Sequence, residues 1–138
     1  QPTGEDWRVA RNVVIAASDQ EARDRVMDPN GSNYYYFDYL WKVLKSVNYT
    51  AVMKPDPKAA DDSVTVEQLI DSMVIYGSPN TVAEKLLAFR ERTGPFHGLL
   101  MAMMDGQGAN LERERESMRR LATEVMPVIR KAVPSPAR

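Results

Sequence analysis

The sequence predicts an α/β fold with a parallel sheet of about three strands, flanking helices and one insertion. Three short apolar runs recur along the chain, at residues 13–17, 73–76 and 98–103, and each is followed by a helical pattern of apolar residues. That alternation is typical of parallel strands joined by crossover helices. The 138 residues are enough to bury one core, so we expect one domain.

The first strand-and-helix unit spans residues 7–27. Its apolar run at 13–17 is followed by Ser18, which stands three residues before Glu21. At that spacing a hydroxyl and a carboxylate bond the free amides of a first helical turn. A helix should therefore begin here, and it should end before Pro29, which cannot donate a backbone hydrogen bond.

Residues 28–64 form the predicted insertion. Turn residues precede Ser32, a candidate cap for a second helix whose apolar stripe is Phe37, Leu40, Trp41 and Leu44. Residues 48–63 then lose any period and include two prolines, so we expect an irregular segment. The four aromatic residues at 34–37 cover more than one face of the helix. They indicate core or subunit packing, with a lid over an apolar substrate as the alternative.

Residues 65–133 hold two further strands and their helices. Thr65 and Gln68 repeat the capping spacing before a short helix that leads into the second strand. Ser78 is then expected to cap a helix with Pro79 at its first position, where the missing amide costs nothing. Gly94 and Pro95 should end that helix. After the third strand, a long helix should bury one stripe made of Leu111, Met118, Leu121, Val125 and Ile129.

The composition excludes several kinds of site and partner. Eighteen basic and nineteen acidic residues leave a net charge of −1, which provides no overall basic face for nucleic acid. The apolar runs are far shorter than the ~20 residues of a membrane-spanning helix. With no cysteine, disulfides, thiolate metal sites and cysteine nucleophiles are absent. Phosphate-loop, dinucleotide-binding and metal-ligand motifs are missing too. We therefore expect a cytoplasmic protein that has no metal site.

Ordered blocks of sequence, rather than one motif, carry a resemblance to a known family. The most distinctive block is Val74-Ile75-Tyr76-Gly77-Ser78-Pro79, and the others are residues 7–12, 18–25, 35–41, 80–86, 94–101 and 124–127. Together they resemble the closing segment of the bacterial-luciferase-like flavin monooxygenases, most closely the limonene-monooxygenase-like branch. The resemblance covers nearly the whole chain.

The resemblance implies the C-terminal part of a (β/α)8 TIM barrel, with the three strands as the sixth, seventh and eighth. It also implies an FMN-dependent monooxygenase that uses oxygen and reduced flavin from a separate flavin reductase to oxygenate a small organic substrate. A whole barrel needs roughly 250 residues, so more than half of it is absent from this chain. We therefore expect the chain alone to be inactive and to bind FMN weakly.

Two alternatives stay open beside this hypothesis. The same barrel serves deazaflavin-dependent oxidoreductases, which are relatives of the family. The chain is otherwise a non-catalytic partial barrel that acts through homo-oligomerisation. Unpaired sheet edges favour association, either with a second copy or with a missing N-terminal half.

Barrel geometry sorts the candidate site residues, because the chemistry of such folds lies at the carboxyl ends of the strands. Gly77 and Ser78 offer free amides at a helix start, which favour the phosphate of a cofactor. Met104 and Asp105 follow the third strand and are candidates for substrate contact. The simpler alternatives are a helix cap for Ser78, and likewise for Ser18, and a polar turn for the other pair.

Other polar residues receive no catalytic assignment. Asp19 lies at the same productive end, directly after Ser18. His97 precedes the third strand, at the opposite end, so a structural or solvent-facing role is expected. Arg11 is either a member of a buried ion pair or a surface residue. The catalytic residues therefore stay unassigned.

Overall fold

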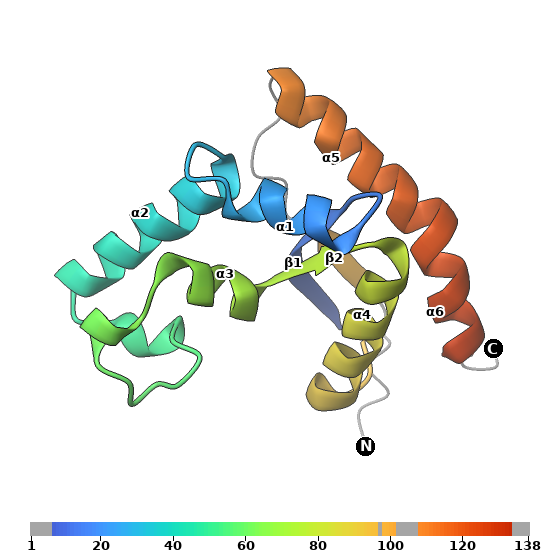
Figure 1. The fold of residues 1–138 in the computed structure, drawn as a ribbon. Helices are drawn as coiled ribbons and strands as arrows, with labels where there is room; N and C mark the ends of the chain where they lie inside the picture. Colours follow the sequence, from blue (N-terminus) through green and yellow to red (C-terminus); the bar gives the residue numbers. More distant parts are fainter. Residues whose placement is uncertain (1–6, 97, 102–107, 134–138) are drawn as a thin grey trace.

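The computed structural model describes residues 7–96, 98–101 and 108–133, which form one parallel sheet with helices. The strands are β1 (Arg8–Ile15), β2 (Val74–Gly77) and β3 (Gly98–Met101). The α-helices are α1 (Asp19–Met27), α2 (Ser32–Ser46), α3 (Val66–Met73), α4 (Pro79–Thr93), α5 (Gly108–Arg120) and α6 (Met126–Ala132). The remaining elements are two short 3₁₀-helices, η1 (Thr50–Val52) and η2 (Asp61–Ser63), and a short π-helix, η3 (Leu121–Val125) (Figure 1). The predicted α/β class with three parallel strands is confirmed.

The central position in the sheet belongs to β1, which lies between β2 and β3. Residues 12–15 pair with 74–77 of β2, and residues 8–11 pair with 98–101 of β3. Consecutive barrel strands are neighbours, so the sixth, seventh and eighth would follow the order β1-β2-β3. The order β2-β1-β3 differs, and a partial barrel is not confirmed. In this structure β3 pairs with the edge of β1 that the fifth strand would occupy in a barrel. That edge of β1 is therefore not open.

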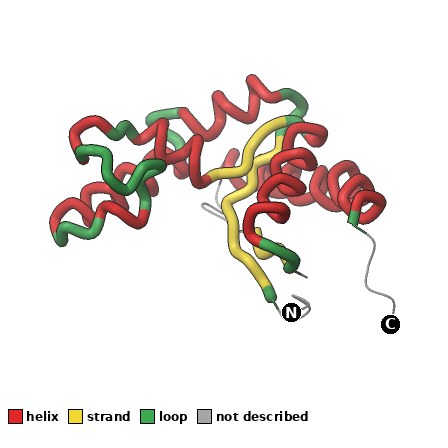
Figure 2. Tube along the Cα trace, turned by 90° about the horizontal axis from the view of Figure 1, so that it is seen from below, coloured by secondary structure: helices red, strands yellow, loops and turns green. Residues whose placement is uncertain are grey.

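Helices cover both faces of the sheet, as the two views in Figures 1 and 2 show. The connection from β1 to β2 and the connection from β2 to β3 run across the sheet in opposite directions. Because both connections are expected to be right-handed, their helices lie on opposite faces of the sheet. Helices α1 and α3 pack on the face of Val14 and Tyr76, with α2 packed on them from outside, and α4 and η3 pack on the face of Val13, Ile15 and Ile75. A barrel has all its helices outside.

The first core lies under α2, whose Phe37 and Trp41 are buried. It also contains Val14, Ala16, Ala22, Val26, Met53, Leu69, Ile70, Val74 and Tyr76. The predicted apolar stripe of α2 faces this core. The predicted cap at Ser32 is wrong, because Gly31 holds the N-cap position in an extended conformation and Ser32 is already the first helical residue.

Three other helix ends agree with the sequence. The Ser18 hydroxyl accepts a hydrogen bond from the Glu21 amide at 3.2 Å. Thr65 and Gln68 form a reciprocal capping box, with bonds of 2.9 and 3.3 Å. Gly94 ends α4 with φ 87°, a conformation that favours glycine.

The insertion is irregular between α2 and α3, as predicted, and a buried lysine organises it. The Lys54 ammonium donates to the Ala59 carbonyl at 2.6 Å and to the Asp61 carboxylate at 2.9 Å. The Thr50 hydroxyl donates to the same carboxylate at 2.9 Å. The bond from Lys54, followed by the one from Thr50, holds the pKa of Asp61 below its usual range.

The C-terminal helix changes its winding before Pro127. Proline lacks an amide and its ring crowds the carbonyl four residues earlier, and the wider π-turn η3 accommodates both effects. Three residues of the predicted stripe, Leu121, Val125 and Ile129, pack in a second core, which lies on the sheet face of Val13, Ile15 and Ile75. The predicted burial of Met118 is wrong, because the neighbouring Ser117 takes the position that faces the sheet.

Ser117 completes the edge of β1 beyond the described end of β3. Its hydroxyl accepts from the Ile15 amide at 2.9 Å and donates to the Val13 carbonyl at 3.4 Å. All three groups are buried, where a backbone group without a partner costs roughly 1–3 kcal/mol. One side chain of α5 therefore satisfies groups that a neighbouring strand would otherwise pair.

Replacing Ser117 tests this role. The change Ser117→Ala should lower the free energy of unfolding by about 1–3 kcal/mol, because the Ile15 amide and the Val13 carbonyl lose their partner. As a control, Ser63→Ala removes an exposed hydroxyl that bonds the Ala60 carbonyl, and should change stability by less than about 0.5 kcal/mol. Urea denaturation followed by circular dichroism measures both, and equal effects would contradict the role.

Candidate functional site

The carboxyl ends of β1 and β2 lie side by side, and α1 and α4 begin at this edge (Figure 1). In open α/β sheets ligands bind outside the carboxyl ends of the strands. Asp19 from the start of α1 meets Ser78 at the start of α4 here. The candidate residues for substrate contact, Met104 and Asp105, lie outside the described residues.

The Asp19 carboxylate caps α4. Oδ1 accepts from the Ser78 amide at 2.7 Å, and Oδ2 accepts from the Thr81 hydroxyl at 2.9 Å. Ser78 is the N-cap residue, but its hydroxyl donates to the Thr81 hydroxyl oxygen at 3.2 Å instead of bonding a helix amide. The predicted cap by the Ser78 side chain is therefore wrong, because a carboxylate from α1 supplies the acceptor.

Charge and backbone conformation both support this contact. The Ser78 amide, followed by the Thr81 hydroxyl, holds the pKa of Asp19 below its usual value. Negative charge is also favourable at a helix N-terminus. Gly77 allows the close approach: it has φ +152°, and a Cβ there would lie 2.7 Å from Thr81 Cγ2 and 2.9 Å from Asp19 Oδ1. A side chain at this position would force the Asp19 contact apart.

The same contacts bear on the predicted phosphate site at Gly77 and Ser78. The Ser78 amide is already bonded, and a phosphate would meet the Asp19 carboxylate at close range. The residues as they are arranged therefore do not fit a phosphate at the start of α4. Contact of Gly77 and Ser78 with a flavin stays a prediction, and it requires Asp19 to move.

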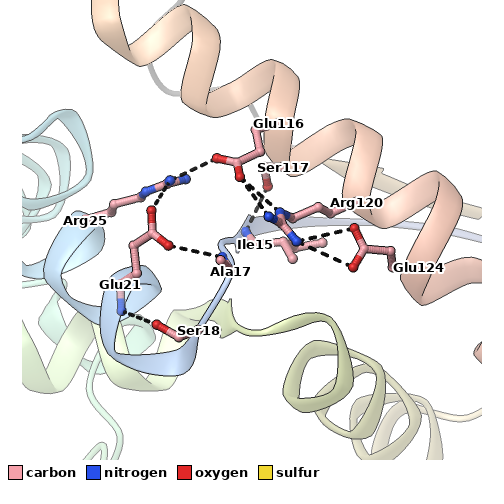
Figure 3. Close-up of polar contacts among 9 residues, drawn as sticks. All are labelled: Ile15, Ala17, Ser18, Glu21, Arg25, Glu116, Ser117, Arg120 and Glu124. Carbon is pink, nitrogen blue, oxygen red and sulfur yellow. Dashed lines mark hydrogen bonds and ion pairs between the residues drawn. The ribbon is translucent and has the colours of Figure 1, made fainter.

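An ion-pair network crosses the end of β1 and joins α1 to α5 (Figure 3). Arg25 Nη2 lies 2.5 Å from a Glu21 oxygen and 2.9 Å from a Glu116 oxygen. Glu116 also pairs with Arg120 at 3.0 Å, and Arg120 pairs with Glu124 at 3.3 Å. The Arg25 bond, against the effect of burial, holds the pKa of Glu116 below its usual value. Because two carboxylates neutralise Arg25, it presents little net positive charge to a ligand.

A small polar cavity lies beside this network. Its volume is about 30 Å³, and Arg25, Asn33 and Ser117 line part of it. Arg25 Nη1 and Asn33 Oδ1 are buried and have no hydrogen-bond partner in the part of the chain that the structure describes. A cavity of this size with polar walls suits an ordered water rather than an organic ligand. Arg25 also lines an open groove of about 530 Å³.

The remaining sequence candidates do not gather at this edge. Arg11 is an exposed residue whose guanidinium lies 4.5 Å from the centre of the Phe89 ring, so its surface alternative is the observed one. His97 lies outside the described residues.

Among residues 7–96, 98–101 and 108–133, no carboxylate or histidine cluster has the spacing of a metal site. None of the helices in those ranges is long and apolar enough to span a membrane.

Neither Glu116 nor Ser117 was identified from the sequence as a residue of this edge. The sequence did hold a signal for the Asp19 contact. Asp19 follows the first strand and Gly77-Ser78 ends the second, so neighbouring parallel strands would bring these residues together. No comparable local signal marked Glu116 or Ser117, since both depend on where α5 packs.

By sequence and by fold, the chain is similar to monooxygenases. It is 30% and 31% identical to 2,5-diketocamphane 1,2-monooxygenases 1 and 2 of Pseudomonas putida, over 135 residues in each case. Each match covers 94% of this chain and 36% of the relative, so the chain spans about a third of the length of the relatives it matches. No known family model matches the sequence.

A solved structure shares the fold. It is the oxygenating constituent of 3,6-diketocamphane monooxygenase of Pseudomonas putida, a type II Baeyer–Villiger monooxygenase in complex with FMN. The TM-score is 0.74 at 28% identity, over 87% of this chain and 33% of that one. These matches support the resemblance to luciferase-like flavin monooxygenases, and they do not confirm the limonene-monooxygenase branch.

The Asp19 contact predicts a pH dependence. Folding lowers the pKa of Asp19 below its usual 3.8, so the carboxylate stabilises the fold fully above that pH and loses its effect as pH falls through the lower folded-state value. Asp19→Asn should therefore be less stable than the wild type at neutral pH, and the gap should close below 3.8. Thermal unfolding across this range measures it. The control Asp24→Asn, which affects a bond to the exposed Gln20 side chain, should show a smaller gap.

The ion-pair network predicts a difference between two glutamates of α5. Glu116→Gln should lower the free energy of unfolding by about 1–2 kcal/mol, because two largely buried guanidiniums lose their shared carboxylate. Glu112→Gln affects an exposed pair with Arg115 at 2.8 Å and should cost less than about 0.5 kcal/mol. Chemical denaturation measures both, and a larger loss for Glu112→Gln would refute the network's role.

Proposed function

We propose that this chain is the C-terminal part of an FMN-dependent monooxygenase of the luciferase-like family. The observation that carries the proposal is the match over 135 residues, 94% of the chain, to two diketocamphane monooxygenases. The structural likeness to a monooxygenase bound to FMN supports the same cofactor. We extend the proposal to a separate flavin reductase, a small organic substrate, a cytoplasmic location and an N-terminal half that completes the enzyme.

The substrate class that the relatives suggest is a cyclic ketone. In a Baeyer–Villiger oxygenation, one atom of O₂ is inserted between the carbonyl carbon and its neighbour, which gives a lactone. The other oxygen atom leaves as water, and the reduced flavin supplies the two electrons and is oxidised. The cofactor provides this chemistry when bound, and the protein provides binding and orientation.

The chain's own contribution is proposed to be a wall of the site at the carboxyl edge of its sheet. Gly77 and Ser78 are proposed cofactor contacts that become available when Asp19 leaves the start of α4. Met104 and Asp105 are proposed substrate contacts. Alone, the chain should bind FMN weakly, because its own carboxylate holds the Ser78 amide.

A segment exchange tests the proposal. The matching segment of 2,5-diketocamphane 1,2-monooxygenase 1 is replaced by this chain, and the chimera is supplied with reduced FMN, ¹⁸O₂ and 2,5-diketocamphane. The chimera should quench FMN fluorescence and form a lactone that carries one ¹⁸O atom. Fluorescence quenching measures FMN binding, and the labelled lactone measures the reaction.

Two controls define the outcome. The relative with the segment deleted, and the isolated chain, should quench FMN fluorescence far less than the chimera and should form no lactone. A chimera that is folded by circular dichroism but does not bind FMN would count against the proposal. Turnover by the isolated chain would show that it is an enzyme in its own right.

A further inference from the structure

The turn that joins α1 to α2 contains a reactive pair of residues (Figure 1). Asn30 is followed directly by Gly31, and no other of the six asparagines in the sequence precedes a glycine. An asparagine side chain loses its amide when the backbone nitrogen of the next residue attacks its carbonyl carbon. Glycine favours this attack, because it has no Cβ to hinder the approach and has the freest backbone. Asn30 is therefore the asparagine with the most reactive neighbour.

The Asn30 side chain is accessible and unbonded. Asn30 is exposed, and it lines an open groove of about 610 Å³ that Tyr35 of α2 and Asn110 of α5 also line. Its backbone amide donates to the Asp28 carboxylate at 2.9 Å, whereas its side-chain amide makes no hydrogen bond within the part of the chain that the structure describes. Water can therefore reach the side-chain carbonyl carbon, and no bond to a neighbour opposes its rotation.

The fold favours the glycine that makes the pair reactive. Gly31 holds the N-cap position of α2, and a Cβ there would lie 3.1 Å from the Asp28 carbonyl oxygen and 3.4 Å from the Arg25 carbonyl oxygen. The Gly31 amide also donates to the Asp28 carbonyl at 2.8 Å, which closes the turn. A larger residue would crowd these carbonyls, so the reactive pair is built into the junction between the two helices.

We propose that Asn30 is a site of spontaneous deamidation in the folded protein. The Gly31 nitrogen loses its proton to hydroxide and bonds to Asn30 Cγ. The Asn30 side-chain nitrogen takes a proton from water and leaves as ammonia, which closes a succinimide ring. Water then adds to either ring carbonyl and opens the ring. The product is aspartate or isoaspartate at position 30, with one water consumed, one ammonia released and no change of oxidation state.

The turn must open briefly before the attack. The proton that leaves Gly31 is the one that the structure shows bonded to the Asp28 carbonyl. Exposed turns open locally at a small free-energy cost, because few buried contacts hold them. The reaction uses none of the residues at the carboxyl edge of the sheet, so it stands apart from the proposed monooxygenase function.

The new carboxylate would lie directly before α2, whose start has no cap of its own. The N-cap residue provides no side-chain hydrogen bond, and the first turn contains no acidic residue. A negative charge at a helix N-terminus is stabilising, so aspartate at position 30 should strengthen the start of α2. Isoaspartate carries the same charge but adds a methylene group to the main chain, which displaces Gly31 from the N-cap.

Mass spectrometry of the whole chain tests the reaction. After incubation of the folded chain in mildly alkaline buffer, the tryptic peptide of residues 26–42 should gain about one mass unit at position 30. Isoaspartyl methyltransferase should label the same peptide. The internal control is Asn48, which is also exposed but precedes Tyr49, and Asn30 should convert at least about tenfold faster. Equal conversion of the two asparagines, or none of Asn30, would overturn the proposal.

Two substitutions test the effect of the product. Asn30→Asp should raise the melting temperature by about 1–4 °C at low ionic strength, because its carboxylate lies before the start of α2. Asn48→Asp adds the same charge just after the end of α2 and should not raise it. Thermal unfolding followed by circular dichroism measures both, and added salt should reduce the gain. An Asn30→Asp variant no more stable than Asn48→Asp would overturn the stabilising effect of the product.

Discussion

Strand β1 is the element on which the other parts of the fold depend, because both its edges and both its faces are in use. Its second half bonds β2, its first half bonds β3, and Ser117 bonds the edge that β3 does not reach. Val14 points into one core and Val13 and Ile15 into the other. Residues 13–15, the buried second half of β1, are accordingly all apolar, whereas the first half of the strand carries the exposed Arg8 and Arg11.

Local signals in the sequence were sufficient for the elements and insufficient for their arrangement. Capping spacings such as Thr65 to Gln68 act within one turn, so they located helix starts correctly. The strand order and the site depend on groups that are distant in the chain. The Asp19 to Ser78 bond joins residues 59 apart, and the Ser117 to Ile15 bond joins residues 102 apart. No local pattern encodes such pairs, and the family resemblance supplied a barrel order that the isolated chain does not adopt.

The carboxyl edge of the sheet is satisfied by the chain's own side chains. Asp19 accepts a hydrogen bond from the Ser78 amide at the start of α4, and Glu116 of α5 pairs with Arg25 of α1. These contacts stabilise the fold by using groups that a ligand would otherwise bind. The edge therefore lies where a functional site is expected, but its polar groups take part in structural interactions.

The central place of β1 also sets the order in which the protein can assemble during synthesis. The strand leaves the ribosome before its partners at residues 74–77 and 98–101 and the hydroxyl of Ser117. Until these are synthesised, β1 lacks the bonds that they supply. Contacts this distant slow folding, because long loops must close before any bond forms. The nascent chain thus passes through a period in which a holding chaperone would protect it from aggregation.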